Sequence, residues 1–305
     1  MRIILMGQAP FGAKTLEALL GRGEEVIAVY TPTDERGKED PLKILAKERN
    51  LHIRQPVSYK DPDVFTDFKR FSPDLLIMAF VTVIIPTPFL DFPKYGAICY
   101  HPSLLPRHRG ASGINWAIIM GDGRTGLTIF WPDGGIDTGP ILVQKEVSIK
   151  SDVTTGALYF NLLFPMGIEA ILESVELIKK GKAPRIPQDE SKSTYEPPCD
   201  EKVARIDWAK SGKQIYNLIR GCDPQPGAYS FWKDQKIHFY NTLFSPGGVE
   251  NQAGEIIGLT GKHITVSTRD GVLEITKVKG PDLGKVEVSQ FVSKTGIKVG
   301  DRFTG

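Results

Sequence analysis

Two apolar runs with a helical pattern between them constrain the fold of this chain most. Residues 2–6 (RIILM) and 25–30 (EVIAVY) are nearly continuous apolar runs, which is typical of strands covered on both faces. Residues 13–20 between them carry leucines at helical spacing. A strand, a helix and a strand within about 30 residues form a βαβ unit. The pattern therefore predicts an α/β fold with a parallel-rich sheet.

This βαβ unit lacks the features of a dinucleotide site. Gly7 and Gly12 do not form the G-x-G-x-x-G pattern that lets a backbone approach a pyrophosphate. The second strand ends in residues 31–33 (TPT), where a ribose-binding enzyme carries an acidic residue. We therefore expect no NAD(P) in this chain.

Further buried strands alternate with helical segments along the first half of the chain. Residues 41–49 and 60–71 favour short helices, and residues 74–80 (DLLIMAF) favour a buried strand. An apolar loop, residues 81–86 (VTVIIP), follows this strand. At the carboxyl end of a parallel strand, such a loop is either the wall of a site for a flat ring or a packed connection. Composition alone leaves both interpretations open.

The stretch 101–110 (HPSLLPRHRG) places a histidine where a strand gives way to a loop. Residues 97–100 read as the buried strand and residues 114–120 as the following helix. Ligands of open α/β sheets bind at the carboxyl ends of the strands. His101 is therefore a candidate for acid–base chemistry, although a lone histidine is more often structural.

Asp137 lies in the loop of a predicted hairpin. Residues 126–131 and 141–147 read as strands, and residues 132–139 between them are rich in Pro, Gly, Asp and Thr. If the strand ends lie side by side, Asp137 meets His101, and a carboxylate favours the imidazolium form. Such a pair can move protons and stabilise an oxyanion. The alternative is that Asp137 only forms the turn.

The chain divides into two predicted domains. With 305 residues and 41% apolar content, it is long enough for two cores. A long amphipathic helix over residues 154–180 completes a first domain of residues 1–181. Residues 182–202 are rich in Pro, Ser and charge and read as a linker. Residues 203–305 hold a short helix at 214–220 and then short strands separated by glycine turns, which predicts a small β-barrel.

Cysteines and apolar runs indicate the compartment. Cys99, Cys199 and Cys222 show no metal-ligand or redox spacing, so we expect free thiols, a reducing compartment and no metal. No apolar run approaches the roughly 20 residues of a membrane span, and the first residues do not resemble a signal peptide. We expect a cytoplasmic protein without membrane contact.

Residues 101–110 and 136–139 (IDTG) resemble the H-x-S-L-L-P-x-x-x-G and Asp-Thr-Gly motifs of the 10-formyltetrahydrofolate-dependent formyltransferase superfamily. The similarity extends into the tail, at residues 205–208 (RIDW). Within the superfamily, the chain is most similar to the hydrolase region that begins the 10-formyltetrahydrofolate dehydrogenases. Residues 115–116 (NW), 129–131 (IFW) and 240–243 (YNTL) resemble that branch. The methionyl-tRNA formyltransferases are the next most similar branch.

The resemblance implies a Rossmann-like formyltransferase domain followed by an OB-like barrel. It implies that 10-formyltetrahydrofolate is substrate and tetrahydrofolate product, with the folate in the sheet crevice. His101 would act as general acid and oxyanion stabiliser, and Asp137 would hold it protonated and accept protons from the nucleophile. Val83, Ile84 and Ile85 would wall the folate site. The further implied contacts are made by the backbone of Ser103, Leu104, Leu105 and Pro106 and by residues from Trp131 to Asp133.

Two departures from the superfamily pattern bear on the acceptor. Transferases keep an asparagine two residues before the histidine, where this chain has Cys99. A thiol is a poor donor to an oxyanion, and the hydrolase branch also lacks the amide there. The loop of residues 31–38 is short and of mixed charge, unlike the longer basic insert that grips tRNA. We therefore expect hydrolysis of 10-formyltetrahydrofolate to formate and tetrahydrofolate, with Cys99 determining the acceptor.

The alternative is formyl transfer to an amine, either methionyl-tRNA or a small amino compound. A folate-binding module without chemistry is a third hypothesis, which the presence of both His101 and Asp137 disfavours. In the dehydrogenases, carrier and oxidising domains follow this region. The chain ends about where those domains would begin, so we expect them as partners only in a longer protein.

Overall fold

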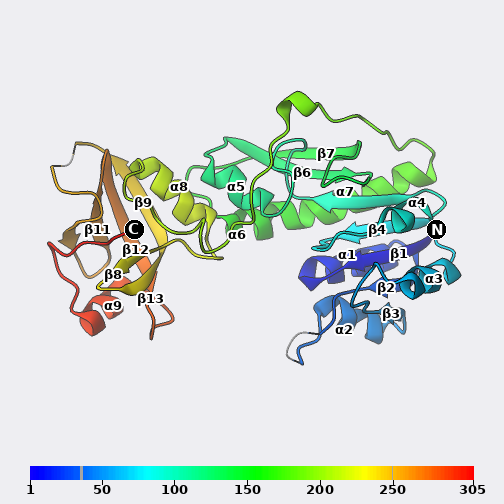
Figure 1. Cartoon of the computed structure of the whole chain (residues 1–305), viewed down its shortest axis with the longest axis horizontal. Helices are drawn as coiled ribbons and strands as arrows, with labels where there is room; N and C mark the ends of the chain where they lie inside the picture. The colour runs from blue at the N-terminus through cyan, green and yellow to red at the C-terminus, as the bar shows by residue number, and fades with distance from the viewer. Residues whose placement is uncertain (35–36, 249) are drawn as a thin grey trace. The chain divides into compact units, whose positions relative to one another are not determined.

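The computed structural model describes residues 1–34, 37–248 and 250–305 (Figure 1). Residues 35 and 36, which fall in the predicted loop 31–38, lie outside the described residues. Contacts group the chain into two compact units. Unit 1 comprises Met1–Gly110, Gly126–Val147 and Asn161–Tyr195, and unit 2 comprises Ala111–Thr125, Ser148–Phe160 and Glu196–Gly305.

Unit 1 is built on a seven-stranded sheet. In spatial order its strands are β3 (His52–Arg54), β2 (Glu25–Tyr30), β1 (Arg2–Gly7), β4 (Leu75–Ala79), β5 (Ala97–His101), β6 (Arg124–Phe130) and β7 (Ile141–Ser148). The first five strands pair in parallel, and β6 pairs antiparallel to β5. This arrangement confirms the expected α/β class with a parallel-rich sheet.

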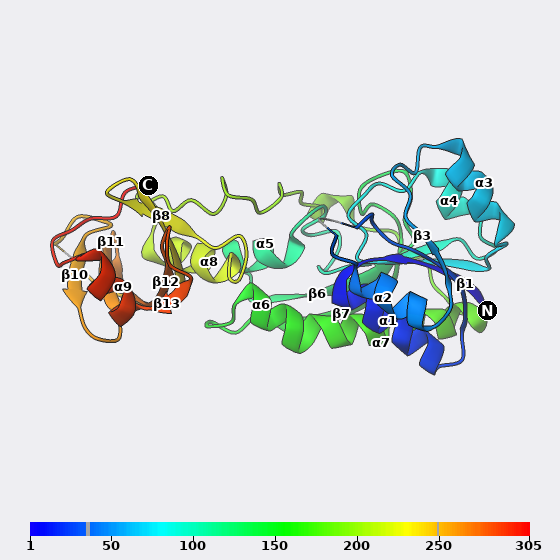
Figure 2. The ribbon, with the colours of Figure 1, turned by 90° about the horizontal axis from the view of Figure 1, so that it is seen from below.

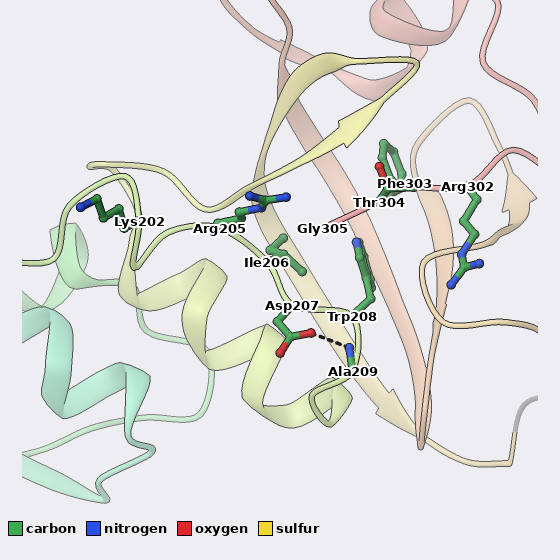
Figure 3. Close-up of a pocket in the computed structure, with 10 residues that line it drawn as sticks. All are labelled: Lys202, Arg205, Ile206, Asp207, Trp208, Ala209, Arg302, Phe303, Thr304 and Gly305. Carbon is green, nitrogen blue, oxygen red and sulfur yellow. Dashed lines mark hydrogen bonds between the residues drawn. The ribbon is translucent and has the colours of Figure 1, made fainter.

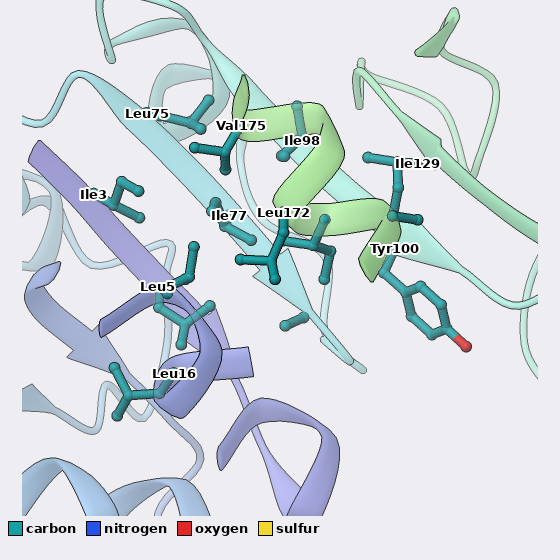
Figure 4. Packing of buried hydrophobic residues seen from close by; sticks show 14 of the residues in the cluster. Ile3, Leu5, Leu16, Leu75, Ile77, Ile98, Tyr100, Ile129, Leu172 and Val175 are labelled. Atoms are coloured by element: carbon teal, nitrogen blue, oxygen red, sulfur yellow. The ribbon is translucent and has the colours of Figure 1, made fainter. Parts of the chain in front are cut away.

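Side-chain alternation divides each central strand between two cores. On β1, Ile3 and Leu5 belong to the larger core, whereas Ile4 and Met6 belong to a smaller core on the other face. The same alternation runs along β4 and β5 because successive side chains of a strand point to opposite faces. Figure 4 shows the larger core, where Leu172 and Val175 of a covering helix pack among the residues of the sheet.

Helices supply residues to both cores. The larger core takes residues from α1 (Ala9–Gly21), α2 (Pro41–Glu48) and α7 (Phe164–Lys179), and the smaller core takes them from α3 (Pro62–Arg70) and α4 (Thr87–Asp91). Figures 1 and 2 both show α1 beside α7. Leucine and isoleucine side chains at helical spacing produce these buried stripes.

The predicted helix over residues 154–180 forms with one irregularity. It consists of α6 (Thr155–Leu158), a π-helical turn (Tyr159–Leu163) and α7. Pro165 lacks the N–H that would bond one turn back, which accounts for the wider turn just before it. Thr155–Lys179 is long and apolar enough to span a membrane by length and composition alone. Core helices pass the same test, and α7 packs in the larger core.

Unit 2 contains a curved antiparallel sheet and its own core. The strands are β8 (Tyr229–Trp232), β9 (Gln235–Pro246), β10 (Ile256–Leu259), β11 (Ile264–Thr268), β12 (Gly271–Lys279) and β13 (Lys285–Glu287). They lie in the order β10-β11-β12-β9-β8, with β13 on β12. The helices are α5 (Gly113–Ile119), α8 (Gly212–Gly221) and α9 (Val288–Thr295), besides α6.

The last residues of the chain bridge both edges of this sheet. Thr304 pairs with Phe231 of β8, and Arg302 pairs with Glu255 just before β10. Phe303 between them is fully buried. The sheet thereby closes on itself, as the prediction of a small barrel requires. Because the pairing joins segments about 50 to 70 residues apart, the sequence did not indicate it.

The segment of residues 182–202, predicted as a linker, divides between the two units. Residues up to Tyr195 group with unit 1, whereas Ala111–Thr125, expected in the first domain, groups with unit 2. Gln188 and Glu190 hydrogen-bond to Arg109, some 80 residues earlier, and hold the segment in place. Composition marked this segment as irregular but carried no sign of those contacts. The domain boundaries at residues 181 and 203 stay a prediction.

Candidate functional site

His101 is the last residue of β5 and shares a strand face with Cys99. Its strand partner is Thr128 on β6, and the partner of Cys99 is Phe130. Because side chains alternate along a strand, Cys99 and His101 point to the same face, toward the smaller core. Residue 99 therefore lies beside the histidine, as the spacing of two predicts.

The structure brings His101 and Asp137 together. His101 Nδ1 lies 3.4 Å from Asp137 Oδ2. His101 Nε2 lies 2.7 Å from the carbonyl oxygen of His108. A carbonyl oxygen only accepts hydrogen bonds, so Nε2 carries a proton and Nδ1 is the nitrogen that faces the carboxylate. The sequence predicted this contact only if the two strand ends lie side by side, and the structure shows the two side chains next to each other.

The loop after His101 is held rigidly by buried hydrogen bonds. Thr128 Oγ1 donates to the Ser103 carbonyl (2.7 Å) and accepts from the Leu105 N–H (3.2 Å). Gln144 Nε2 donates to the Leu105 carbonyl at 2.9 Å. Ser103 Oγ itself donates to the Arg107 carbonyl. These hydrogen bonds fix the backbone of residues 103–107, which follow His101 in the chain.

The loop 132–139 holds Asp137 in an unusual backbone conformation. Asp137 has φ +56°, and its Oδ2 accepts the Gly110 N–H at 2.7 Å. Asp133 Oδ1 accepts the Thr138 hydroxyl at 2.5 Å and closes the loop from within. Gly139 lies so close to Trp131 that an added Cβ would stand 1.8 Å from the Trp131 carbonyl oxygen. Only glycine fits there, which explains the last residue of the Ile-Asp-Thr-Gly motif.

Sequence reasoning missed the residues that support this loop. Gln188 Nε2 donates to the carbonyls of Asp137 (2.8 Å) and Gly139 (2.6 Å). Its Oε1 accepts from Arg109 at 2.8 Å. Arg109 also forms a bidentate ion pair with Glu190. The hydrogen bonds from Arg109 lower the pKa of the Glu190 carboxyl group. The only signal in the sequence was an arginine directly before Gly110 in the motif.

Cys99 is a protonated thiol in this environment. Burial raises the pKa of the Cys99 thiol above its usual range, and the negative charge of Asp137 raises it further. A thiol that stays protonated is a weak nucleophile. Cys99 is therefore a small neutral neighbour of the histidine.

A cavity of about 490 Å³ lies at the carboxyl ends of the parallel strands of unit 1. Gly7 ends β1 and Phe80 follows β4, and both line the cavity. Between these neighbouring strands the order of the sheet reverses, which is where open α/β sheets bind ligands. The wall includes Val83 and Ile84, which are 55% and 80% exposed.

The other residues predicted to contact folate differ from Val83 and Ile84 in their exposure. Ile85 is buried in the smaller core and does not line the cavity. Ser103, Leu105 and Trp131 are also buried, so their side chains support the loops rather than face solvent. Leu104 and Pro106 are partly exposed, and Asp133 is exposed. Backbone atoms of the buried residues remain the groups expected to contact a ligand.

A second cavity, of about 560 Å³, belongs to unit 2 (Figure 3). Arg205, Trp208 and Arg302 line it, and the Asp207 carboxylate accepts the Ala209 N–H at 2.9 Å beside it. None of its lining residues is a predicted site residue. Within the ranges that the structure describes, no cluster of His, Cys, Asp or Glu could hold a metal ion.

Known families match both parts of the chain. Residues 1–173 match the family described as formyl transferase, and residues 199–296 match the formyl transferase C-terminal domain. The chain belongs to the formyl transferase family. The resemblance read from residues 101–110 and 136–139 is thereby confirmed.

Relatives of this formyl transferase include 10-formyltetrahydrofolate dehydrogenases and a methionyl-tRNA formyltransferase. Human cytosolic 10-formyltetrahydrofolate dehydrogenase is 39% identical over 268 residues, which cover 86% of this chain and 30% of the relative. The chain thus spans about a third of the length of such dehydrogenases. Methionyl-tRNA formyltransferase of Ruminiclostridium cellulolyticum is 36% identical over 310 residues, 99% of both chains.

Solved structures share the fold of this formyl transferase. HypX from Aquifex aeolicus, solved in complex with tetrahydrofolic acid, superposes with a TM-score of 0.69 at 20% identity and covers the whole chain and 51% of HypX. The sugar 3N-formyl transferase WlaRD superposes with a TM-score of 0.71 at 18% identity over 92% of this chain and 98% of WlaRD. At such identities the likeness shows the fold alone.

Proposed function

We propose that this formyl transferase hydrolyses 10-formyltetrahydrofolate to formate and tetrahydrofolate. The observation that carries the proposal is the His101–Asp137 pair with a thiol, Cys99, beside it in place of an amide. The pair supplies the proton chemistry of formyl release. The neutral thiol supplies little of the oxyanion binding that a transferase obtains from an amide.

In this mechanism a water oxygen attacks the formyl carbon and the carbon–nitrogen bond to the folate breaks. Asp137 accepts a proton from the water, and His101 donates toward the formyl oxygen and the departing nitrogen. The separation of 3.4 Å between Nδ1 and Oδ2 is longer than the 2.7–2.9 Å of a tight charge-assisted bond. A water or formyl oxygen can therefore bridge the two groups without breaking a strong bond.

The cavity at the switch point supports folate binding in unit 1. Val83 and Ile84 follow β4, and His101 ends the neighbouring strand β5, so all three lie at the same end of the sheet. Exposed apolar side chains beside a crevice suit a flat, weakly polar ring. The proposal assigns the folate ring to the Val83–Ile84 wall, with its formyl group toward His101.

Formylation of an amine acceptor is the second candidate function. It is favoured by the methionyl-tRNA formyltransferase relative, whose sequence aligns over 99% of this chain. In that reaction the amine nitrogen, instead of water, attacks the formyl carbon at the same His101–Asp137 pair. Both reactions use the same donor, so the acceptor is what an experiment must resolve.

The test mixes purified chain with 10-formyltetrahydrofolate and measures formate and tetrahydrofolate together. We expect steady release of both in equal amounts. His101→Ala and Asp137→Asn should each reduce the rate by about 10²–10⁴-fold because each removes one partner of the pair. His52→Asn is the matched control, since His52 is an exposed histidine on β3.

Adding methionyl-tRNA or small amines to the same reaction separates the two functions. Hydrolysis predicts that formate release does not depend on acceptor and that no formylated amine accumulates. Formylated acceptor in place of formate would instead establish the transferase function. Turnover by His101→Ala equal to that of the unsubstituted chain would exclude both.

A further inference from the structure

Two cysteines far apart in the sequence meet in unit 2. Cys199 Sγ and Cys222 Sγ lie 3.6 Å apart although 23 positions separate the residues. Cys222 caps the end of α8 and is fully buried, whereas Cys199 lies in a loop and is partly exposed. Both are free thiols. Their spacing in the sequence gives no hint of this contact.

Backbone hydrogen bonds fix both sulfur-bearing segments. The Cys199 N–H donates to Ser112 Oγ at 3.1 Å, and the Cys222 N–H donates to the Leu218 carbonyl at 2.9 Å. The two sulfur atoms are in van der Waals contact. A disulfide requires the two sulfur atoms to approach from 3.6 Å to about 2.05 Å.

We propose that Cys199 and Cys222 form a reversible disulfide when the protein meets a low-molecular-weight disulfide such as oxidised glutathione. The inference rests on this contact and is independent of the formyl chemistry. In a reducing compartment such a bond is transient and responds to oxidation.

The environments of the two thiols set the order of the exchange. The hydrogen bond that Cys222 donates lowers the pKa of the Cys199 thiol. The same hydrogen bond, together with burial, raises the pKa of the Cys222 thiol. Cys199, which is also the more exposed of the two residues, therefore attacks first. Its thiolate forms a mixed disulfide with one half of the reagent and releases the other half as a thiol. Cys222 then attacks Cys199 Sγ and releases the second thiol, so two protein thiols are oxidised and one reagent disulfide is reduced.

The disulfide would secure α5, the helix that follows the histidine loop. Trp116 Nε1 donates to the Pro197 carbonyl at 2.7 Å, two residues before Cys199. Asn115 Nδ2 donates to the Gly221 carbonyl at 2.8 Å, one residue before Cys222. The proposed disulfide would therefore link the two segments, around Cys199 and Cys222, that accept hydrogen bonds from α5. Oxidation should reduce local opening of α5.

Peptide mapping of the full chain tests the proposal. The protein is incubated with oxidised glutathione, the remaining thiols are blocked with N-ethylmaleimide in denaturant, and the chain is digested with trypsin. We expect peptide 193–202 linked to peptide 221–233, with a loss of two hydrogens, while Cys99 in peptide 95–107 is alkylated. Excess reduced glutathione should restore all three thiols.

Two cysteine variants test the order of attack. Cys222→Ala should accumulate the glutathione mixed disulfide on Cys199, because the resolving thiol is absent. Cys199→Ser should leave Cys222 unmodified, because the buried thiol does not attack the reagent. Cys99→Ala should behave as the unsubstituted chain in this assay and is the matched control.

Two physical readouts complete the test. The oxidised chain should melt about 5 °C higher in the transition of unit 2, and amide exchange of residues 111–120 should slow several-fold. Alkylation of both Cys199 and Cys222 after incubation of the natively folded protein would overturn the proposal. A linked peptide that contains Cys99 would overturn it as well.

Discussion

At the level of single residues, Cys99 is the neighbour of His101 that bears most on the proposed acceptor. Strand periodicity places Cys99 on the same face as His101, and the high pKa of the thiol keeps it neutral beside the Asp137 carboxylate. A neutral thiol neither attacks the formyl carbon nor binds an oxyanion well. In the proposed reaction, His101 and Asp137 move the protons, and residue 99 lies beside the charge that would develop on the formyl oxygen.

Cys99→Asn should raise the rate of formyl transfer to an amine. An amide N–H donates to the formyl oxyanion, and such a donor contributes about 10²–10³-fold in rate. The measurement is formylated amine produced by the variant and by the unsubstituted chain at equal acceptor concentration. Cys99→Ala is the control, since it removes the thiol without adding a donor, and an equal gain in both variants would contradict the role assigned to the amide.

At the level of elements, the His101–Asp137 pair depends on hydrogen bonds between separate loops. The strand end supplies His101, but the loop 132–139 supplies Asp137, and the segment around Gln188 holds that loop through two carbonyls. Arg109 ties the same segment to the histidine loop. The distance between His101 and Asp137 is therefore set by hydrogen bonds from a third segment of the chain.

Gln188→Ala should lower kcat by about tenfold with a smaller change in KM. The substitution removes both donors from the 132–139 loop, and a small displacement of a reacting group costs about that much or more. Steady-state kinetics measure the effect, and a thermal melt confirms that the fold persists. Gln290→Ala on exposed α9 is the matched control. A rise in KM with unchanged kcat would show that Gln188 serves binding rather than the positioning of Asp137.

Gly139→Ala should destabilise unit 1 by about 1–3 kcal/mol, the usual cost of forcing an extra methyl into a filled space. The new Cβ would stand 1.8 Å from the Trp131 carbonyl oxygen, so the loop must shift. Denaturant unfolding measures the change in the free energy of unfolding. Gly134→Ala in the same loop is the matched control, because nothing lies within 4 Å of its Cβ position. Equal stability of the two variants would contradict the close packing described for Gly139.

At the scale of the whole molecule, several ion pairs of unit 1 lower the pKa of a carboxyl group that reaches the surface. Hydrogen bonds from lysine or arginine lower the pKa of six of its carboxyl groups. They are Glu17, Asp34, Glu39, Asp67, Asp189 (to about 2) and Glu190. Each pair is small by itself because water screens exposed charges. Their sum makes the stability of unit 1 sensitive to acid.

Acid should therefore loosen unit 1 progressively below about pH 4.5. A carboxyl group whose pKa is lower in the folded state stabilises the fold above its unfolded pKa, and this contribution disappears as the pH falls through the folded value. Pulsed amide exchange at fixed pH, after equilibration at successively lower pH, measures protection in each unit. Loss of protection in the barrel of unit 2 before unit 1 would contradict this prediction. High salt should reduce the effect, since it screens the same pairs.

Local patterns in the sequence determined the α/β class, the buried strands, the histidine at a strand end and the motif at Asp137. These features depend on neighbouring residues, so periodicity and turn chemistry reveal them. The segment of residues 182–195 shows the limit. Its composition indicated a linker but not the hydrogen bonds by which Gln188 holds Arg109 and the loop 132–139.

Tertiary structure alone decided the contacts between distant segments. The support of Asp137 by Gln188, the burial of Ile85, the closure of the barrel through Thr304 and the contact of Cys199 with Cys222 each join residues that no local pattern relates. Sequence periodicity reports which face a side chain occupies, but not which distant segment packs against that face. Only the folded chain brings those partners within bonding distance.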